Sequence, residues 1–201
     1  MADRISSIRR QTRETTVEVV CQLDGNGEAV LALPIGFLEH MLTSLAKHSH
    51  FGLSVSGTGD SQVDDHHLCE DVAITLGRAL QVAWSRSEAI HRFGTAFVPM
   101  DDALALVALD ISGRPYLHWQ VTLPQARIGS FDTELVAEFM RALAVNAGIT
   151  LHITLLHGTN THHIIEAIFK ALGQALYQAT RIDSALGGVP SSKGAVQWVE
   201  Q

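Results

Sequence analysis

Two copies of the pattern His-His-x-x-Glu are the residues of this sequence best suited to bind metal ions. The copies, in DDHHLCED and NTHHIIEA, consist of His66, His67, Glu70, His162, His163 and Glu166. Adjacent residues on a helix point about 100° apart, so two neighbouring histidines cannot easily hold one ion together. A glutamate three or four residues later shares a face with either histidine. The geometry predicts two different sites, each using one histidine of each pair. Imidazole with carboxylate suits Mn²⁺, Fe²⁺, Ni²⁺ or Zn²⁺.

Two ions need more ligands than the paired motifs supply, and the preceding helical segments offer them. His40, in FLEHM, lies 26 residues before His66, and Glu138, in VAEFM, lies 24 residues before His162. These two positions correspond to each other in the internal repeat described below. A single copy of the motif would be better explained as a helix start with a surface acid. Two copies at matched places of a repeat favour metal binding.

The motifs lie within an internal repeat that predicts the fold. A shift of 96 residues places His66, His67, Glu70, Leu76, Gly77, Ala79 and Leu80 over His162, His163, Glu166, Leu172, Gly173, Ala175 and Leu176. Each half has the pattern β-β-α-β-α by hydrophobic periodicity and β-branched content. We therefore expect an α+β fold made of two similar halves, 1–93 and 94–201, which form one compact unit with a C-terminal tail.

The expected elements follow the same order in both halves. In the first half we expect strands at 12–23, 29–33 and 52–59 and helices at 36–48 and 67–88. In the second half we expect strands at 95–112, 116–123 and 149–158 and helices at 131–148 and 162–181. Asp132 or Thr133 is the expected cap of the helix at 131–148.

Composition narrows the class of protein. The chain has 201 residues, 46% hydrophobic and 17% charged, with a formal net charge of -7, which argues against a nucleic-acid surface. Its two cysteines make no dense disulfide framework, which favours a reducing compartment. The sequence contains no run of 18 apolar residues that would predict a membrane span, and its first residues lack the apolar core of a signal peptide. We expect a cytoplasmic protein that binds neither membranes nor nucleic acid.

Four stretches together resemble the imidazoleglycerol-phosphate dehydratase family of histidine biosynthesis. They are residues 37–80, 99–119, 158–176 and 190–194, and the similarity extends over about 9–194. The resemblance implies a hydro-lyase that converts D-erythro-imidazole glycerol phosphate to imidazole acetol phosphate and water, with two Mn²⁺ ions per active site. It implies a homo-oligomer of 24 subunits built from trimers, with metals at subunit contacts. It also implies that each half is a four-stranded sheet with two helices on one face, similar to domain 2 of ribosomal protein S5.

The resemblance assigns roles to individual residues. As metal ligands it implies His40, His66, His67, Glu70, His162, His163 and Glu166. Many members of the family have histidine at the position of Glu138, so the balance of ligands at one metal stays open, although carboxylates suit Mn²⁺. Glu14 is implied as the base, and His48 is a weaker candidate for substrate contact or proton transfer. The implied phosphate-binding residues are Arg92, Arg114, Lys170, Ser192, Lys193 and Gly194.

The mechanism expected from the resemblance uses the imidazole ring of the substrate. With a metal on each ring nitrogen, the ring becomes an imidazolate that expels the neighbouring hydroxyl, and the resulting diazafulvene acidifies the next carbon. Two other functions fit the same residues: a binuclear metal-dependent phosphate-ester hydrolase, or a non-catalytic shell protein stapled by metals. The His-rich ligand set favours a nitrogenous ligand over a phosphate ester.

Overall fold

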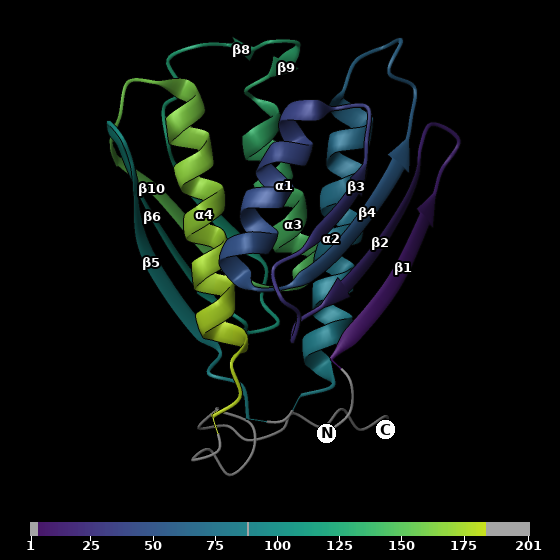
Figure 1. Cartoon of the computed structure of the whole chain (residues 1–201), viewed down its shortest axis with the longest axis vertical. Helices are drawn as coiled ribbons and strands as arrows, with labels where there is room; N and C mark the ends of the chain where they lie inside the picture. Colours follow the sequence, from purple (N-terminus) through teal and green to yellow (C-terminus); the bar gives the residue numbers. More distant parts are fainter. Residues whose placement is uncertain (1–3, 88, 184–201) are drawn as a thin grey trace, which may run out of the picture.

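The computed structural model describes residues 4–87 and 89–183, which form two four-stranded sheets with helices between them (Figure 1). The first half contains β1 (Ile5–Gln11), β2 (Thr16–Gln22), β3 (Ala29–Ala32), α1 (Gly36–Ser49), β4 (Gly52–Thr58) and α2 (His66–Ser85). The second half contains β5 (Phe93–Met100), β6 (Ala103–Asp110), β7 (Tyr116–Gln120), β8 (Arg127–Ile128), β9 (Phe131–Asp132), α3 (Leu135–Ala147), β10 (Thr150–His157) and α4 (Thr161–Thr180).

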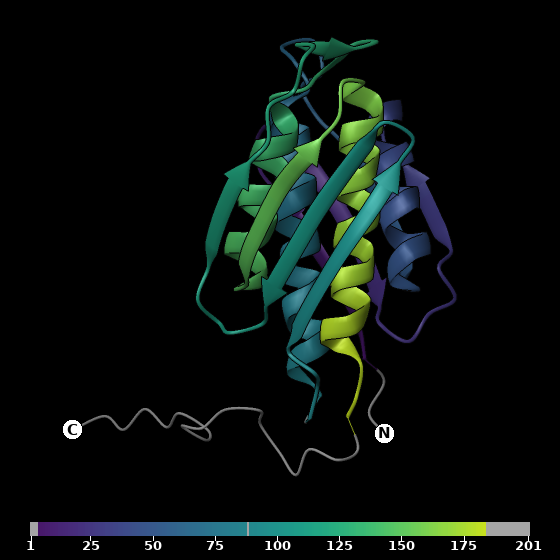
Figure 2. The same cartoon turned by 90° about the vertical axis from the view of Figure 1, so that its left-hand side faces the viewer.

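The two sheets have the same topology, which confirms the expected α+β duplication. Their strand orders are β1-β2-β4-β3 and β5-β6-β10-β7. In each sheet the first two pairs are antiparallel and the last pair is parallel. Strands alternate between buried and exposed positions, as expected for a sheet that is covered by helices on one face. Figure 2 shows the second sheet, with α4 behind it.

The expected order β-β-α-β-α was wrong by one strand in each half. In the first half, the sequence pattern missed β1 because polar groups line its inner face: the Ser6 hydroxyl donates to the carbonyl of Ala79 at 2.7 Å, and Arg10 Nε donates to Asp71 at 2.7 Å. In the second half, residues 95–112 form a hairpin rather than one strand. Its turn contains Asp101, whose φ is 47°, a left-handed conformation that Asp tolerates better than most residues.

The expected start of the third helix was also wrong. Phe131 and Asp132 pair with β8 instead of entering the helix. The Thr133 hydroxyl donates to the carbonyl of Gln125 at 2.7 Å, so it holds the loop and does not cap α3. The N-cap residue is Glu134, whose side chain makes no capping hydrogen bond.

The helices pack across the two halves, so the halves share one core. α2 packs on α3, and α4 packs on α1, while each half's helices also cover their own sheet. Glycines allow these close crossings: a Cβ on Gly77 would lie 2.8 Å from the Leu143 carbonyl oxygen, and one on Gly173 would lie 2.8 Å from that of Leu45. The division at 93/94 falls at the start of β5 and stays a prediction.

Within residues 4–87 and 89–183, no helix is both long enough and apolar enough to cross a membrane.

Candidate functional site

Both histidine pairs lie in the first turn of a helix, where a polar side chain accepts hydrogen bonds from backbone N–H groups. Asn160 caps α4: its side chain accepts from the N–H groups of His162 at 2.9 Å and His163 at 3.3 Å. Asp64, one residue before the N-cap of α2, accepts from the N–H of His66 at 2.8 Å. Asn160 and Asp64 correspond under the 96-residue shift, so these acceptors belong to the repeat as well. Satisfying these otherwise free donors fixes the first turn that carries the histidines.

His40, His162 and Glu166 form one group that could hold a metal ion. Nε2 of His40 lies 3.3 Å, and Nε2 of His162 lies 3.2 Å, from the same Glu166 oxygen, Oε2. All three ligand atoms lie within 4.8 Å of one another. Metal–ligand bonds of about 2.1 Å place neighbouring ligand atoms of one ion roughly 3.0–3.4 Å apart. The spacing and the donor types therefore fit a divalent ion.

Lys170 fixes the charge and orientation of Glu166. Its ammonium lies 2.8 Å from Oε1 of Glu166, which is only 7% exposed. Burial raises the pKa of the Glu166 carboxyl, but Lys170 and His40 outweigh that effect, so the pKa lies below its ordinary value. Glu166 is therefore ionised, with Oε2 left for the histidines. Lys170 was expected to bind phosphate; in a single chain its nearest partners are Glu166 and the Met100 sulfur at 3.3 Å.

The corresponding group in the first half is less closely assembled. Nε2 of His66 lies 4.0 Å from Oε2 of Glu70. Glu138, which corresponds to His40, forms an ion pair with Arg141 one turn later on α3. Among residues 4–87 and 89–183, no group of three metal-binding side chains includes Glu138.

His67 and His163 do not join these groups but are held by carboxylates. Nδ1 of His67 lies 2.9 Å from Asp60, and Nδ1 of His163 lies 2.7 Å from Asp102. The hydrogen bond to Asp60 raises the pKa of His67, and Glu14 adds to that effect. In the described part of the chain, neither metal-competent group contains a histidine from both pairs. The sharing of each site by both pairs is therefore not found within one chain.

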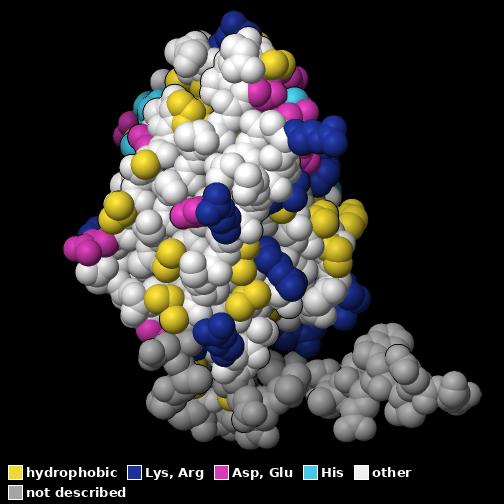
Figure 3. Space-filling view, turned by 90° about the vertical axis from the view of Figure 1, so that its right-hand side faces the viewer, with side chains coloured by type: hydrophobic (Ala, Val, Ile, Leu, Met, Phe, Trp, Pro, Cys, Tyr) yellow, Lys and Arg dark blue, Asp and Glu magenta, His cyan; other side chains and the backbone are white. Residues whose placement is uncertain are grey.

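Glu14 lies in the turn between β1 and β2, beside His67. Its Oε2 is 3.8 Å from His67 Nδ1, and Glu14, Asp60 and His67 form the second group that could hold an ion. The Thr12 hydroxyl accepts from the N–H of Glu14 at 3.1 Å, which orders the turn. The Glu14 side chain is 57% exposed in a single chain, so it is accessible from outside. Figure 3 shows histidine and acidic side chains near this upper end of the molecule.

His48 lies on α1 where that helix crosses α4. Its Cβ is 3.0 Å from the position that a Cβ on Gly173 would occupy. Burial lowers the pKa of His48, and the charge of Lys170 lowers it further. A neutral imidazole at this place can accept or donate a proton.

Arg92 and Arg114 come together at the other end of the second sheet. Arg92 makes two bonds to Asp110, at 2.6 and 3.0 Å, and Arg114 lies 3.8 Å from the same carboxylate. Asp110 ends β6, whereas Asp102, the partner of His163, precedes it. Eight residues of strand at about 3.3 Å each separate the two ends by roughly 26 Å. One chain therefore does not bring these arginines to its own His163.

The remaining phosphate-binding candidates were Ser192, Lys193 and Gly194. They lie outside the described residues.

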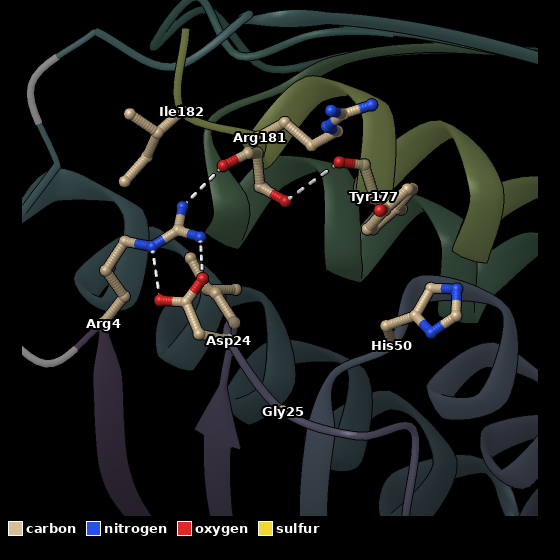
Figure 4. Close-up of a pocket in the computed structure, with 9 residues that line it drawn as sticks. Arg4, Asp24, Gly25, His50, Tyr177, Arg181 and Ile182 are labelled. Carbon is tan, nitrogen blue, oxygen red and sulfur yellow. Dashed lines mark hydrogen bonds and ion pairs between the residues drawn. The ribbon is translucent and has the colours of Figure 1, made fainter. Parts of the chain in front are cut away.

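A pocket of about 450 Å³ lies away from the histidine clusters, where the end of α4 meets the first sheet (Figure 4). Arg4, buried at its wall, donates to both oxygens of Asp24 and to the carbonyl of Thr180. The guanidinium is thus used to join β1, β2 and α4. None of the described residues that line this pocket belongs to the two groups that could hold a metal ion.

Cys69 lies inside the first His-His-x-x-Glu motif, but its burial argues against a role as a metal ligand. Burial raises the pKa of the Cys69 thiol to about 12, and that of Cys21 likewise. A protonated thiol is a poor metal ligand.

The carboxylates Asp60 and Asp102 are site residues that could not be predicted from the sequence. They meet His67 and His163 only in the folded chain, and no sequence spacing indicates these contacts.

Several known proteins are similar to this chain over nearly its whole length. Residues 34–176 match the family model for imidazoleglycerol-phosphate dehydratase. Proteins of that name from Desulforudis audaxviator and Desulforamulus reducens are 56% and 52% identical over 196 residues, which is 98% of this chain and 100% of each relative.

Solved structures of the same enzyme are also similar. The Staphylococcus aureus structure has a TM-score of 0.80 at 42% identity and covers 87% of this chain and 97% of its own. The Pyrococcus furiosus structure has a TM-score of 0.81 at 39% identity, covering 94% and 100%. With the family model, the full-length relatives and the duplicated fold in agreement, the chain belongs to the imidazoleglycerol-phosphate dehydratase family.

Proposed function

We propose that this chain dehydrates D-erythro-imidazole glycerol phosphate to imidazole acetol phosphate and water in histidine biosynthesis, using two Mn²⁺ ions per active site. Full-length relatives named for this reaction support the substrate and the chemistry. The observation that carries the metal part is the group of His40, His162 and Glu166, whose ligand atoms converge around buried Glu166.

Each ion would be held by three side chains of one chain and a histidine from another copy. One set is His40, His162 and Glu166, and the set that corresponds in the repeat is Glu138, His66 and Glu70. His67 and His163 would complete sets in neighbouring subunits, because each is held at Nδ1 and has a second nitrogen left to bind metal. When bound, Mn²⁺ would act as a Lewis acid that polarises the imidazole ring of the substrate.

The residues of the chain would handle the proton and the phosphate. The elimination breaks one C–H bond and one C–O bond, and the hydroxide leaves as water after it gains a proton. Glu14 would take the carbon proton, because its carboxylate lies beside His67 and is accessible. His48 is the second group able to move a proton near Glu166. The phosphate would be bound by Arg92 and Arg114, since guanidinium groups bind phosphate oxygens with charge-assisted hydrogen bonds.

The active site would be assembled from several subunits. Asp110, the partner of Arg92 and Arg114, lies about 26 Å of strand away from Asp102, the partner of His163, farther than one small substrate can reach. An arginine pair from one copy would therefore serve the histidines of another. We propose a homo-oligomer of 24 subunits built from trimers; the number rests on the sequence resemblance. We also propose a cytoplasmic location, which suits two buried, unpaired cysteines.

The experiment measures imidazole acetol phosphate formation before removal of metal, after removal, and after Mn²⁺ is added back. Activity that disappears and returns supports both the reaction and the role of Mn²⁺. Unchanged activity in fully stripped protein would contradict the metal role. No product from protein that has Mn²⁺ bound would contradict the reaction.

A further inference from the structure

We propose that Asp102 is a positioning residue: it holds the proton of His163 on Nδ1 and thereby keeps Nε2 of His163 free to bind a metal ion. Asp60 would do the same for His67, under weaker constraint. This inference rests on the proposed function, since it concerns how a ligand of that site is prepared.

Hydrogen-bond donors surround the carboxylate of Asp102. Its Oδ2 accepts hydrogen bonds from the N–H of Thr159 at 2.7 Å, the Thr159 hydroxyl at 2.9 Å and the N–H of Asn160 at 3.0 Å. Its Oδ1 lies 2.7 Å from Nδ1 of His163. A carboxylate only accepts hydrogen bonds, so Nδ1 of His163 is the donor.

The main chain holds this carboxylate in place. Asp102 lies in the turn between β5 and β6, and Nδ1 of His157 donates to its carbonyl oxygen at 3.0 Å. Asn160, which donates to Asp102, also caps α4 and so ties the turn to the helix that carries His163. The contact is therefore set by the fold.

The position of the proton decides whether the imidazole can be a ligand. A neutral imidazole carries one N–H, so a proton on Nδ1 leaves a lone pair on Nε2. In the free chain, Asp101 lies 3.5 Å from that Nε2, which shows that the nitrogen faces a charged partner outside the core. Carboxylates that orient ligating histidines typically contribute about 10–100-fold to metal affinity.

Asp60 makes the same contact without the same constraint. Its Oδ2 lies 2.9 Å from Nδ1 of His67, but its Oδ1 is buried and has no hydrogen-bond partner in the described part of the chain. The two carboxylates thus differ in one respect: donors surround the second oxygen of Asp102 and none reaches that of Asp60.

That difference makes one substitution act differently at the two positions. In Asp102→Asn, the amide oxygen must face the three donors, so the amide N–H₂ faces His163 and donates to Nδ1. The proton of His163 then moves to Nε2 and blocks the ligand atom; a forced wrong tautomer of this kind disables a histidine. In Asp60→Asn, the amide can turn its oxygen to His67, and the correct tautomer survives.

The test measures Mn²⁺ affinity and the tautomer of His163 in the same full-length proteins. Free Mn²⁺ is followed by electron paramagnetic resonance, and the ring nitrogens of metal-free protein by ¹⁵N NMR. We expect Asp102→Asn to weaken Mn²⁺ binding by about 10–100-fold and to show the Nε2–H form. Asp60→Asn is the matched control and should retain most of the affinity. In a His163→Ala background, Asp102→Asn should cause no further loss.

Two results would overturn the inference: Asp102→Asn binding Mn²⁺ as tightly as the unsubstituted chain, or an Nε2–H form of His163 in the unsubstituted metal-free chain. If Asp102→Asn does not fold, the ¹⁵N NMR measurement of His163 in the unsubstituted chain still tests the inference. An unsubstituted chain that binds no Mn²⁺ would instead contradict the proposed function, while the NMR result would still judge the role of Asp102.

Discussion

At the scale of residues, polar contacts within the chain hold the candidate ligands in place. Glu166 is ionised because Lys170 pairs with one oxygen, and its other oxygen faces His40 and His162. His67 and His163 are fixed by carboxylates from different loops. Ligands fixed in this way lose little side-chain freedom when an ion binds, which favours affinity.

Replacing Glu14 by Gln tests the base at this scale. The variant keeps the size of the side chain but cannot take a proton, so we expect turnover to fall by roughly 100-fold or more. Mn²⁺ content and particle mass should stay unchanged, since Glu14 is not among the expected ligands. Steady-state rates, metal analysis and light scattering check the three quantities.

Glu18→Gln is the matched control, because Glu18 is an exposed acid on neighbouring β2 that pairs with Arg9 at 3.4 Å. It should leave turnover unchanged. Normal turnover in Glu14→Gln would sink the proposed base.

The sequence could predict the candidate ligands but not the groups that hold them. His66, His67, Glu70 and their counterparts are adjacent in sequence and repeated, so their spacing alone is a signal. Asp102 lies 61 residues from His163, and only the hairpin between β5 and β6 brings them together. Lys170 was expected to bind phosphate, but it lies four residues after Glu166 on α4 and pairs with it, as residues at that helical spacing can.

At the scale of elements, the helix crossings between the halves depend on glycine. In Gly77→Ala, the new methyl group would lie 2.8 Å from the Leu143 carbonyl oxygen and 3.0 Å from the N of Ala147. Overpacking of this kind costs about 1–3 kcal/mol, and the better helix propensity of Ala returns at most about 1 kcal/mol. We expect a lower melting temperature by roughly 2–8 °C, and the same direction for Gly173→Ala.

Gly36→Ala is the control for these variants, since Gly36 begins α1 and a Cβ there meets nothing within 4 Å. Its melting temperature should stay level or rise slightly. The comparison uses equal protein and metal concentrations. Equal melting temperatures for Gly77→Ala and Gly36→Ala would show that α2 and α3 can move apart without a loss of stability.

Helices and strands whose inner face is apolar could be predicted from the sequence. Strand β1 could not, because polar residues on its inner face pair with groups on α2. The helices α2 and α4 carry long apolar stripes, and their residues were assigned correctly to within a few positions. Ser6 and Arg10 of β1 break the alternation that marks a strand, yet both point to partners on α2. The pattern of hydrophobic and polar residues does not reveal that a polar residue is buried against a partner elsewhere in the fold.

At the scale of the whole molecule, one chain has surfaces and ligands that are incomplete alone. Large apolar side chains are exposed on the outer faces of both sheets, including Phe97 at 60% and Val30 at 70%. Such patches commonly mark contacts between proteins. Neither His67 nor His163 belongs to the group of His40, His162 and Glu166, and the arginines lie at the other end of the second sheet. Under the proposed function, several copies would complete each site.

Metal removal is therefore expected to weaken the assembly. If His67 and His163 bind ions held by neighbouring subunits, each ion joins two chains, and its loss removes those links. A chelator should convert the particle into smaller oligomers, and added Mn²⁺ should restore its mass, as measured by light scattering with size-exclusion chromatography. His163→Ala should lower the mass at saturating Mn²⁺, because the chain then lacks the donor to its neighbour. A particle of full mass after complete removal of the metal would contradict shared ions and would assign the contacts to the apolar sheet faces alone.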